Sequence, residues 1–117
     1  MRILVIDDHE ALLAEIAEFL MMAGHDVVTA TCAKEAMQIV NSDRDYQVVV
    51  TDISMPGMSG IEMWDNMAPL LPQTKVVFIS STNNSFLRNY LPGVFLSKPF
   101  RLEHLHQAIL ELQLAVA

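Results

Sequence analysis

The sequence predicts an α/β protein built on a doubly wound, five-stranded parallel sheet in the strand order 2-1-3-4-5. Apolar runs of strand length alternate with stretches of helical periodicity, as they do in successive βα units. Four of the five runs are rich in β-branched residues and almost continuously apolar, which is typical of parallel strands covered on both faces. The 117 residues, 52% of them hydrophobic, suffice for one domain over residues 1–117 with its own core.

The strands are expected at residues 3–6, 27–30, 48–51, 76–79 and 94–96. A helix between the first two strands is indicated by an apolar stripe at helical spacing over residues 12–20. Gly24 follows it and suits the left-handed position that ends many helices. The second helix is expected to end at Asn41-Ser42, and Pro69 and Pro72 are expected to terminate the third.

The fourth helix is the least clearly marked. Residues 83–85 offer capping side chains, but residues 86–90 supply barely two turns before Pro92-Gly93 stops them. We therefore expect a shortened fourth helix. A fifth helix is expected to begin just after Pro99, with apolar residues at helical spacing from Leu102 onward.

Five polar side chains stand where predicted strands end. Asp7 and Asp8 follow the first strand, Asp52 the third, Ser80 the fourth and Lys98 the fifth. In the order 2-1-3-4-5 the winding reverses between strands one and three, and ligands bind beyond the carboxyl ends of the strands at that point. We therefore expect these five side chains to converge on one site.

This residue set predicts metal and phosphoryl chemistry. Three crowded carboxylates need a cation to stay ionised, and an all-oxygen ligand set suits Mg²⁺. A carboxylate such as Asp52 can attack phosphorus and form an aspartyl phosphate. The metal and Lys98 would stabilise charge on the equatorial phosphoryl oxygens, and Ser80 could donate a hydrogen bond to them.

Four segments carry a family resemblance: ILVIDD at the first strand, VVVTDISMPGMSG around Asp52, VFISS at the fourth strand and FLSKPF at the fifth. With these motifs the chain resembles, over essentially its whole length, a receiver domain of the two-component response regulators. The resemblance implies the flavodoxin-like receiver fold and a phosphorylation-dependent switch. It also implies that Asp52 accepts a phosphoryl group from the phosphohistidine of a sensor histidine kinase or a histidine phosphotransfer protein.

The resemblance assigns further roles position by position. Asp8 would bind Mg²⁺ directly and Asp7 mainly through water, while Asp52 and the backbone carbonyl of Ser54 would complete the protein ligands. Lys98 would contact the phosphoryl oxygens and precede a cis proline. The switch residues would be Ser80 and Phe95, and the signal would reach a homodimer partner or an output domain through the face formed by helix four, strand five and helix five.

Two departures from the commonest family pattern stand out. Ser80 and Ser81 replace the more frequent Thr and Ala, but both are small, so access for a phosphoryl group should survive. Ser80 and Lys98 are 18 positions apart, a shorter separation than the family leads us to expect, which places the deficit in the fourth helix.

The composition limits the classes of partner that the protein is expected to bind. Seven basic residues against fourteen acidic ones give a net charge of −7, which repels nucleic-acid phosphates and anionic membrane surfaces. Cys32 is the only cysteine, so no disulfide forms within the chain, and no apolar stretch reaches the length of a membrane span. We expect a cytoplasmic protein with no direct nucleic-acid or membrane partner.

We expect the switch not to be an enzyme, since it would perform only self-phosphotransfer and autodephosphorylation. Three other functions compete with this interpretation. Mg²⁺-dependent phosphatases that form an aspartyl phosphate resemble D-x-D, whereas Ser54 stands second after Asp52 here. A cofactor-binding flavodoxin-like module would need a Gly-, Ser- or Thr-rich first loop, and residues 7–10 read DDHE. A phosphorylation-independent, receiver-like adaptor would not need all five site residues.

Other conspicuous residues favour structural roles. The methionines of residues 55–67 are expected to fill core gaps, and Trp64 to pack rather than bind ligand. His104 and His106 lie two apart on a helix and should face different ways, which argues against a metal pair. His9 and His25 are expected at the surface or as caps.

Overall fold

The computed structural model describes residues 1–81 and 93–114. Its elements alternate along the chain as β1 (Arg2–Ile6), α1 (Glu10–Met22), β2 (Asp26–Ala30), α2 (Ala33–Ser42), β3 (Val48–Asp52), α3 (Gly60–Met67), a short 3₁₀ turn (Ala68–Leu70), β4 (Lys75–Ser80), β5 (Val94–Ser97) and α5 (Leu102–Leu114). Each expected strand is found to within one residue at either end. The shortened fourth helix expected over residues 82–92 lies outside the described residues.

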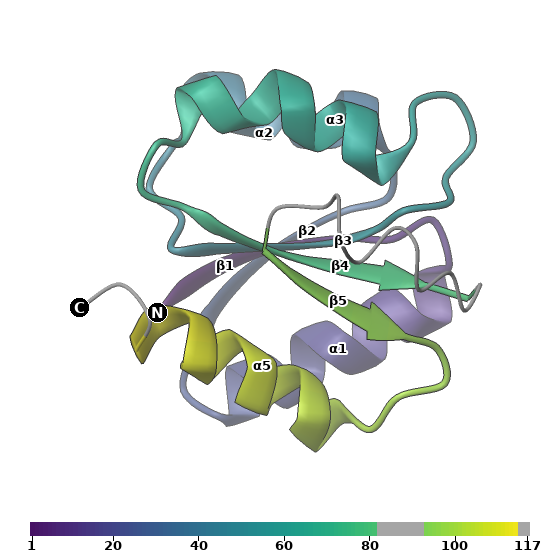
Figure 1. Ribbon diagram of the computed structural model, residues 1–117, viewed down its shortest axis with the longest axis vertical. Helices are drawn as coiled ribbons and strands as arrows, with labels where there is room; N and C mark the ends of the chain where they lie inside the picture. Colours follow the sequence, from purple (N-terminus) through teal and green to yellow (C-terminus); the bar gives the residue numbers. More distant parts are fainter. Residues whose placement is uncertain (82–92, 115–117) are drawn as a thin grey trace.

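The five strands form one parallel sheet in the order β2-β1-β3-β4-β5, as predicted (Figure 1). Ile3 of β1 pairs with Val27 of β2 on one side and with Val48 of β3 on the other. The winding therefore reverses at β1, and the carboxyl ends of β1 and β3 lie next to each other at the centre of the sheet.

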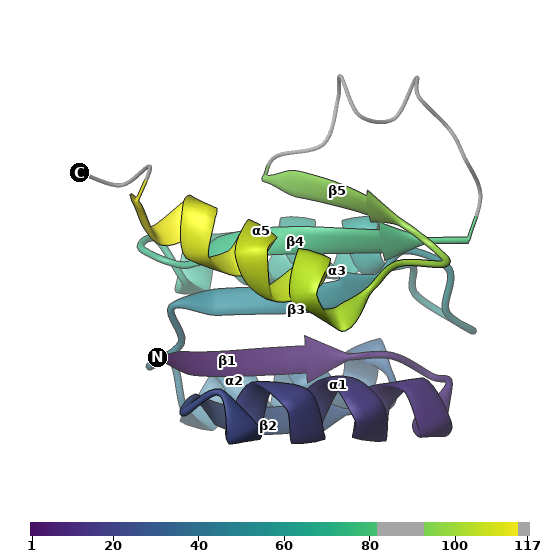
Figure 2. The ribbon, with the colours of Figure 1, turned by 90° about the horizontal axis from the view of Figure 1, so that it is seen from below.

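Helices cover both faces of the sheet: α2 and α3 lie on one face, and α1 and α5 on the other (Figures 1 and 2). Alternate residues of β1 serve the two layers, since Leu4 and Ile6 pack under α2 and α3 while Ile3 and Val5 pack under α1 and α5. All four are buried, which explains why the strand is apolar at successive positions.

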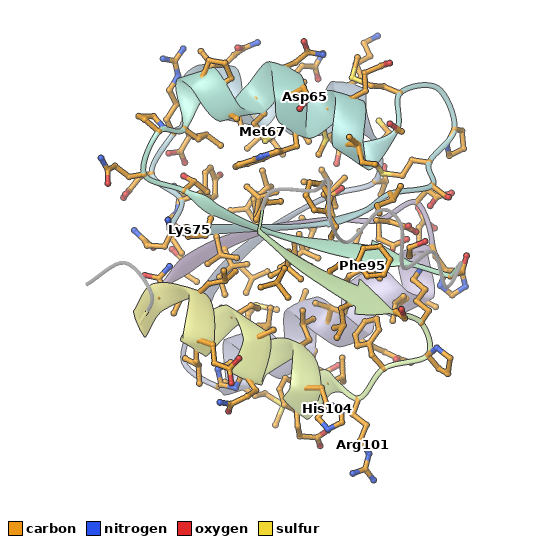
Figure 3. All side chains as sticks on the ribbon, in the orientation of Figure 1. Asp65, Met67, Lys75, Phe95, Arg101 and His104 are labelled. Atoms are coloured by element: carbon orange, nitrogen blue, oxygen red, sulfur yellow. The ribbon has the colours of Figure 1, made fainter. Side chains whose placement is uncertain are left out.

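The expected core methionines occupy the layer under α3. Met55, Met63 and Met67 are buried there together with Trp64, and Met58 packs against them from the edge of the cluster. Figure 3 shows Met67 on the side of α3 that faces the sheet. These residues therefore fill the core, as predicted, and leave no methionine surface on this helix.

Local hydrogen bonds define where α1 and α5 begin. Nδ1 of His9 accepts a hydrogen bond from the backbone N–H of Leu12 at 3.3 Å and so caps α1. The fifth helix begins at Leu102, the first residue of its predicted apolar stripe, and the backbone carbonyl of Arg101 accepts its first helical hydrogen bonds. Phe100 packs into the layer under α1 and α5 before the helix starts.

Among the described residues, no helix is long and apolar enough to cross a membrane.

Candidate functional site

The predicted site residues come together at the carboxyl edge of the sheet. Asp7 directly follows β1, Asp52 is the last residue of β3, Ser80 ends β4 and Lys98 directly follows β5. Asp52 pairs in register with Ile79, and Ser80 pairs with Ser97. The parallel register alone therefore brings residues from four separate segments of the chain to one place.

Asp7, Asp8 and Asp52 form a carboxylate cluster. One oxygen of each lies within 4.8 Å of the others. Asp7 and Asp52 are only 1% and 5% exposed, whereas Asp8 is exposed at the rim. The set offers hard oxygen donors on one open side, which is the kind of site that Mg²⁺ occupies with a few protein ligands and several waters.

Lys98 reaches into this cluster from β5. Its Nζ lies 3.0 Å from Oδ2 of Asp52 and 3.5 Å from Oδ2 of Asp7. Three carboxylates against one ammonium leave two negative charges without a counter-charge in the cluster, and a divalent cation would balance them. The residues present therefore fit the metal that the sequence predicted. The Lys98-Pro99 peptide bond is cis, as the family resemblance implied.

Backbone amides hold the other carboxylate oxygens. Oδ1 of Asp7 accepts a hydrogen bond from the N–H of His9 at 2.8 Å, and Oδ1 of Asp52 accepts one from the N–H of Ser54 at 3.1 Å. Each buried carboxylate thus has one oxygen fixed by the chain that follows it and one oxygen turned toward Lys98. The carboxylates are oriented before any ligand arrives.

Charge in the cluster is unevenly balanced. Burial raises the pKa of the Asp7 carboxyl, and the negative charge of Asp52 adds to this, while the His9 amide and Lys98 oppose it. Burial opposes the charged form of Lys98, but its hydrogen bond and charge interactions with Asp52 and Asp7 prevail and raise its pKa. Lys98 therefore stays cationic, and a bound cation would favour the charged form of Asp7.

The two predicted switch residues lie on neighbouring strands. Ser80 is buried at the end of β4, and its backbone carbonyl accepts a hydrogen bond from the N–H of Lys98 at 2.7 Å. Phe95 of β5 pairs in register with Phe78 and packs at the edge of the core under α2 and α3 (Figure 3). Ser80 is thus linked to Lys98 of the site, and Phe95 lies on β5, the strand that Lys98 follows.

Sequence reasoning missed two contacts that hold Asp52 from behind. The hydroxyl of Thr51 donates a 3.0 Å hydrogen bond to the backbone carbonyl oxygen of Asp52. Gly60, at the start of α3, packs so closely that a Cβ built on it would lie 2.1 Å from that same oxygen. The only signal in the sequence was a glycine at a helix start, directly after Ser59. Because Ser59 caps the helix by itself, the sequence gave no reason why the next residue should be glycine.

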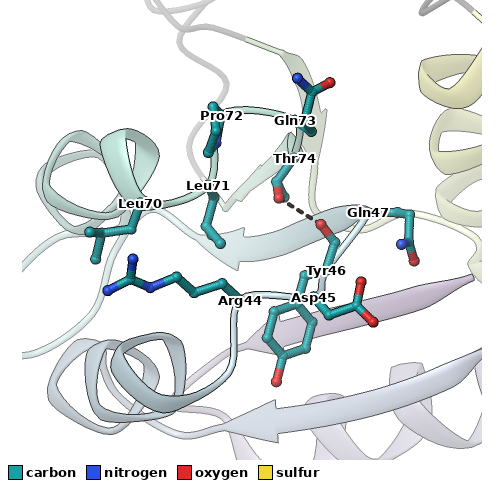
Figure 4. A pocket seen from close by; sticks show the side chains of 9 residues that line it. All are labelled: Arg44, Asp45, Tyr46, Gln47, Leu70, Leu71, Pro72, Gln73 and Thr74. Atoms are coloured by element: carbon teal, nitrogen blue, oxygen red, sulfur yellow. Dashed lines mark hydrogen bonds between the residues drawn. The ribbon is translucent and has the colours of Figure 1, made fainter.

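One surface hollow adjoins this site, and another lies at the opposite edge of the sheet. One of about 430 Å³ adjoins the cluster and is lined by Leu12, Ser81, Lys98, Pro99 and Phe100. The other, of about 340 Å³, lies at the opposite edge of the sheet between the connections that follow α2 and α3 (Figure 4). There the hydroxyl of Thr74 donates to the carbonyl of Tyr46 at 2.6 Å and closes the two connections onto each other. No predicted site residue lines this second hollow.

Comparison with protein families gives a match to "Response regulator receiver domain" over residues 3–110. Among curated proteins, an uncharacterized transcriptional regulatory protein, YrkP, of Bacillus subtilis is 33% identical over 113 residues, covering 93% of this chain and 48% of the relative. The transcriptional regulatory protein TcrA of Mycobacterium tuberculosis is 30% identical and covers 89% of this chain and 42% of its own length. The chain therefore spans about half the length of these relatives.

Solved structures agree with the sequence comparison. A response regulator receiver domain protein from Clostridium thermocellum superposes with a TM-score of 0.84 at 29% identity, covering 94% of this chain and 91% of that one. The response regulator TrrA of Thermotoga maritima, solved in complex with Mg²⁺ and BeF, superposes with a TM-score of 0.83 at 27% identity, covering 95% and 97% of the two chains.

Proposed function

The chain belongs to the response regulator receiver domain family, and from that premise we propose that its carboxylate cluster is a phosphoacceptor site in which Asp52 takes up the phosphoryl group. The observation that carries the proposal is the placement of Lys98 between the buried carboxylates Asp52 and Asp7, 3.0 Å and 3.5 Å away. Asp52 is the carboxylate that lies closest to the ammonium. A nucleophile in that position has a cation ready for the charge that moves onto the phosphoryl oxygens.

The donor is a phosphohistidine of a sensor histidine kinase or a histidine phosphotransfer protein. A carboxylate oxygen of Asp52 forms the new P–O bond while the N–P bond of the donor breaks and the imidazole leaves with that electron pair. Ser54 and Thr51 hold the carboxylate and the backbone of Asp52 during the transfer. Lys98 follows the negative charge from the carboxylate to the phosphoryl oxygens, and the product is an aspartyl phosphate.

Asp7, Asp8, Asp52 and the backbone carbonyl of Ser54 would hold Mg²⁺. When bound, the ion supplies the positive charge that lets the phosphoryl group approach a cluster of carboxylates. Asp8 is exposed and free to meet a hydrated ion directly, whereas Oδ1 of Asp7 is already engaged by the His9 amide. This difference supports a direct ligand at Asp8 and a largely water-mediated one at Asp7.

Ser80 and Phe95 would convert the new phosphoryl group into a change of surface. The Ser80 hydroxyl would hydrogen-bond the phosphoryl oxygens, and Phe95 would turn into the space that this movement opens beside β4. The signal would reach a second copy of the chain, or an output domain, through the face that includes β5 and α5. We propose that residues 1–117 act as one such receiver unit, in the cytoplasm, with protein rather than nucleic-acid partners.

Two other functions make different predictions for the same site. An Mg²⁺-dependent aspartyl-phosphate phosphatase would turn over phosphate esters, and an adaptor independent of phosphorylation would take up no phosphoryl group. Incubation with Mg²⁺ and phosphoramidate, whose N–P bond resembles that of phosphohistidine, should load one phosphoryl group per chain. Under the same conditions p-nitrophenyl phosphate should give no sustained release of nitrophenol. Sustained turnover would favour the phosphatase, and failure to load with either phosphoramidate or acetyl phosphate would favour the adaptor.

A further inference from the structure

Two histidines from distant parts of the chain meet on the α1 and α5 side of the sheet. His25 lies between α1 and β2, and His106 lies in α5, 81 positions further along. Their Nε2 atoms are 2.9 Å apart, and their ring planes cross at 80°. The ring of His106 also contacts Phe19 of α1 edge to face, with 6.0 Å between the centroids. His25 lies at the surface only in part, because its ring is half-buried against α5.

The contacts of the two rings determine where their protons lie. The backbone nitrogen of Met1 is 3.1 Å from Nδ1 of His25 and acts there as a donor. Nδ1 of His25 must then accept, so that ring carries its proton on Nε2 and donates it to Nε2 of His106. His106 accepts at Nε2 and carries its own proton on Nδ1. In this arrangement both rings are neutral.

We propose that His25 and His106 form a proton-sensitive clasp that fastens α5 to the connection between α1 and β2. A proton added to Nδ1 of His25 would face the donor at Met1. A proton added to Nε2 of His106 would face the donor on His25. Proton uptake by either ring therefore removes at least one of the two hydrogen bonds. The added N–H then faces another donor and finds no acceptor.

The surroundings of His25 favour its neutral form. Burial lowers the pKa of His25 below its ordinary value of 6.5, and a positive charge at the Met1 nitrogen or on His106 acts in the same direction. The carboxylates that the packed elements could offer, Glu18 on α1 and Glu103 on α5, are exposed to solvent. Asp26, the residue after His25, is also exposed and is paired with Arg2 at 3.5 Å.

The sign of the pH effect follows from this shift. Unfolded His25 takes up a proton near pH 6.5, whereas the folded ring takes it up only at lower pH. In that window the unfolded state binds more protons, so acid favours unfolding. The contribution of the clasp to stability is complete above pH 6.5 and is lost as the pH falls through the lower pKa of the folded ring.

A shared metal ion is the less favoured reading of the pair. Within residues 1–81 and 93–114, the only group of three or more His, Cys, Asp or Glu side chains close enough to share an ion is the cluster of Asp7, Asp8 and Asp52. Among the residues that the structure describes, no third side chain of this kind lies close enough to share an ion with His25 and His106. The 2.9 Å separation of the two Nε2 atoms is an ordinary N–H···N hydrogen-bond distance, so one ring donates its proton directly to the other.

The clasp goes beyond phosphoryl transfer, since neither histidine belongs to the carboxylate site. Opening it would free α5 from α1 at the point where Phe19, His25 and His106 meet, while the apolar contacts of Leu105 and Ile109 keep the helix on the sheet. The domain would then couple proton concentration to the packing of α5.

Nuclear magnetic resonance on protein with ¹⁵N-labelled histidine tests the clasp directly. At pH above 6.5 the spectra should show His25 protonated on Nε2, His106 protonated on Nδ1, and a scalar coupling between their Nε2 atoms across the hydrogen bond. The coupling should vanish on acidification while the protein remains folded. Absence of the coupling above pH 6.5, or loss of the coupling together with a stability gain when Zn²⁺ is added, would overturn the proposal.

Urea unfolding across the same pH range separates the clasp from other titrating groups. The variant His25→Gln keeps an acceptor for Met1 and a donor for His106 but cannot gain a proton, and His104→Gln on the exposed face of α5 is its matched control (Figure 3). The folding equilibrium changes by up to about tenfold per pH unit for each proton taken up on unfolding. The wild type and His104→Gln should therefore lose stability on acidification more steeply than His25→Gln. Equal slopes in all three would contradict the clasp.

Discussion

A Cβ placed on Gly60 would lie 2.1 Å from the backbone carbonyl oxygen of Asp52. No Cβ tolerates such a separation, and the atom it meets belongs to the backbone of the proposed phosphoacceptor rather than to a flexible side chain. The start of α3 thus packs directly against the backbone of Asp52 and restricts the position of that residue at the end of β3. Glycine at position 60 is required by this contact rather than by an unusual backbone angle.

Replacement Gly60→Ala should therefore both destabilise the protein and slow phosphorylation. Overpacking of this kind costs roughly 1–3 kcal/mol, and relief of the clash must move Asp52 relative to Lys98. The control is Ser59→Ala, which removes the α3 cap formed with the N–H of Glu62 and should cost about 1 kcal/mol without moving Asp52. Urea midpoints and initial rates with acetyl phosphate check both variants. If the two lose equal stability and both keep the wild-type rate, Gly60 does not position Asp52.

Asp7 should destabilise the metal-free protein. Burial raises its pKa above the ordinary 3.8, so the folded state binds more protons than the unfolded state just above that pH. In EDTA, the contribution of Asp7 to stability should therefore fall as the pH rises from about its ordinary value through the raised pKa of the folded carboxyl. The variant Asp7→Asn should unfold at higher urea concentration than the wild type at neutral pH without metal, whereas Asp65→Asn on the exposed side of α3 should not. A less stable Asp7→Asn protein in EDTA would contradict this electrostatic account.

Magnesium affinity should depend on the acidic residues in a definite order. Asp8→Asn should weaken binding at least as much as Asp7→Asn, by about tenfold or more, since even outer-sphere partners change metal affinity by roughly 10–100-fold. Glu10→Gln, in the first turn of α1, should have the smallest effect. Fluorescence of Trp64, which is buried in α3, the helix that follows the loop after Asp52, offers a titration signal. Wild-type affinity in the Asp8 variant would show that the ion binds elsewhere.

Ser80 should be needed for the switch but not for phosphoryl uptake. Phe95 carries no hydroxyl, so burial rather than hydrogen bonding must set the preference of its ring. Aromatic resonances of Phe95 should therefore shift when Mg²⁺ and beryllofluoride are added to the wild type, and stay in place in Ser80→Ala despite normal loading. Ser81→Ala, at the adjacent exposed position, should behave as the wild type. If the Phe95 resonances shift equally in Ser80→Ala and Ser81→Ala, the ring does not respond through Ser80.

The sheet could be predicted from the sequence because its signals are local. Four of the five strands are β-branched, almost continuously apolar runs, and strand order with parallel direction is enough to bring Asp7, Asp52 and Lys98 together. The start of α5 could also be predicted, because the apolar residues at helical spacing begin at Leu102, where the helix begins.

Contacts that depend on close packing could not be predicted in this way. The approach of Gly60 to the Asp52 carbonyl depends on the path of the connection between β3 and α3, which no periodicity encodes. The pairing of His25 with His106 joins residues 81 positions apart through the packing of α5 on α1. Single residues of ordinary type carry no mark of such partners in the sequence.

The central claim is that Asp52 is the residue that carries the phosphoryl group. The protein should be treated with Mg²⁺ and acetyl phosphate, then digested and mapped by mass spectrometry, with Asp52→Asn and Asp8→Asn in parallel. We expect one acid-stable, base-labile phosphoryl group on the wild-type peptide that contains Asp52, none on Asp52→Asn, and a reduced yield at the same position in Asp8→Asn. A phosphoryl group found at equal yield on Asp52→Asn, or mapped in the wild type to any other residue, would contradict the account.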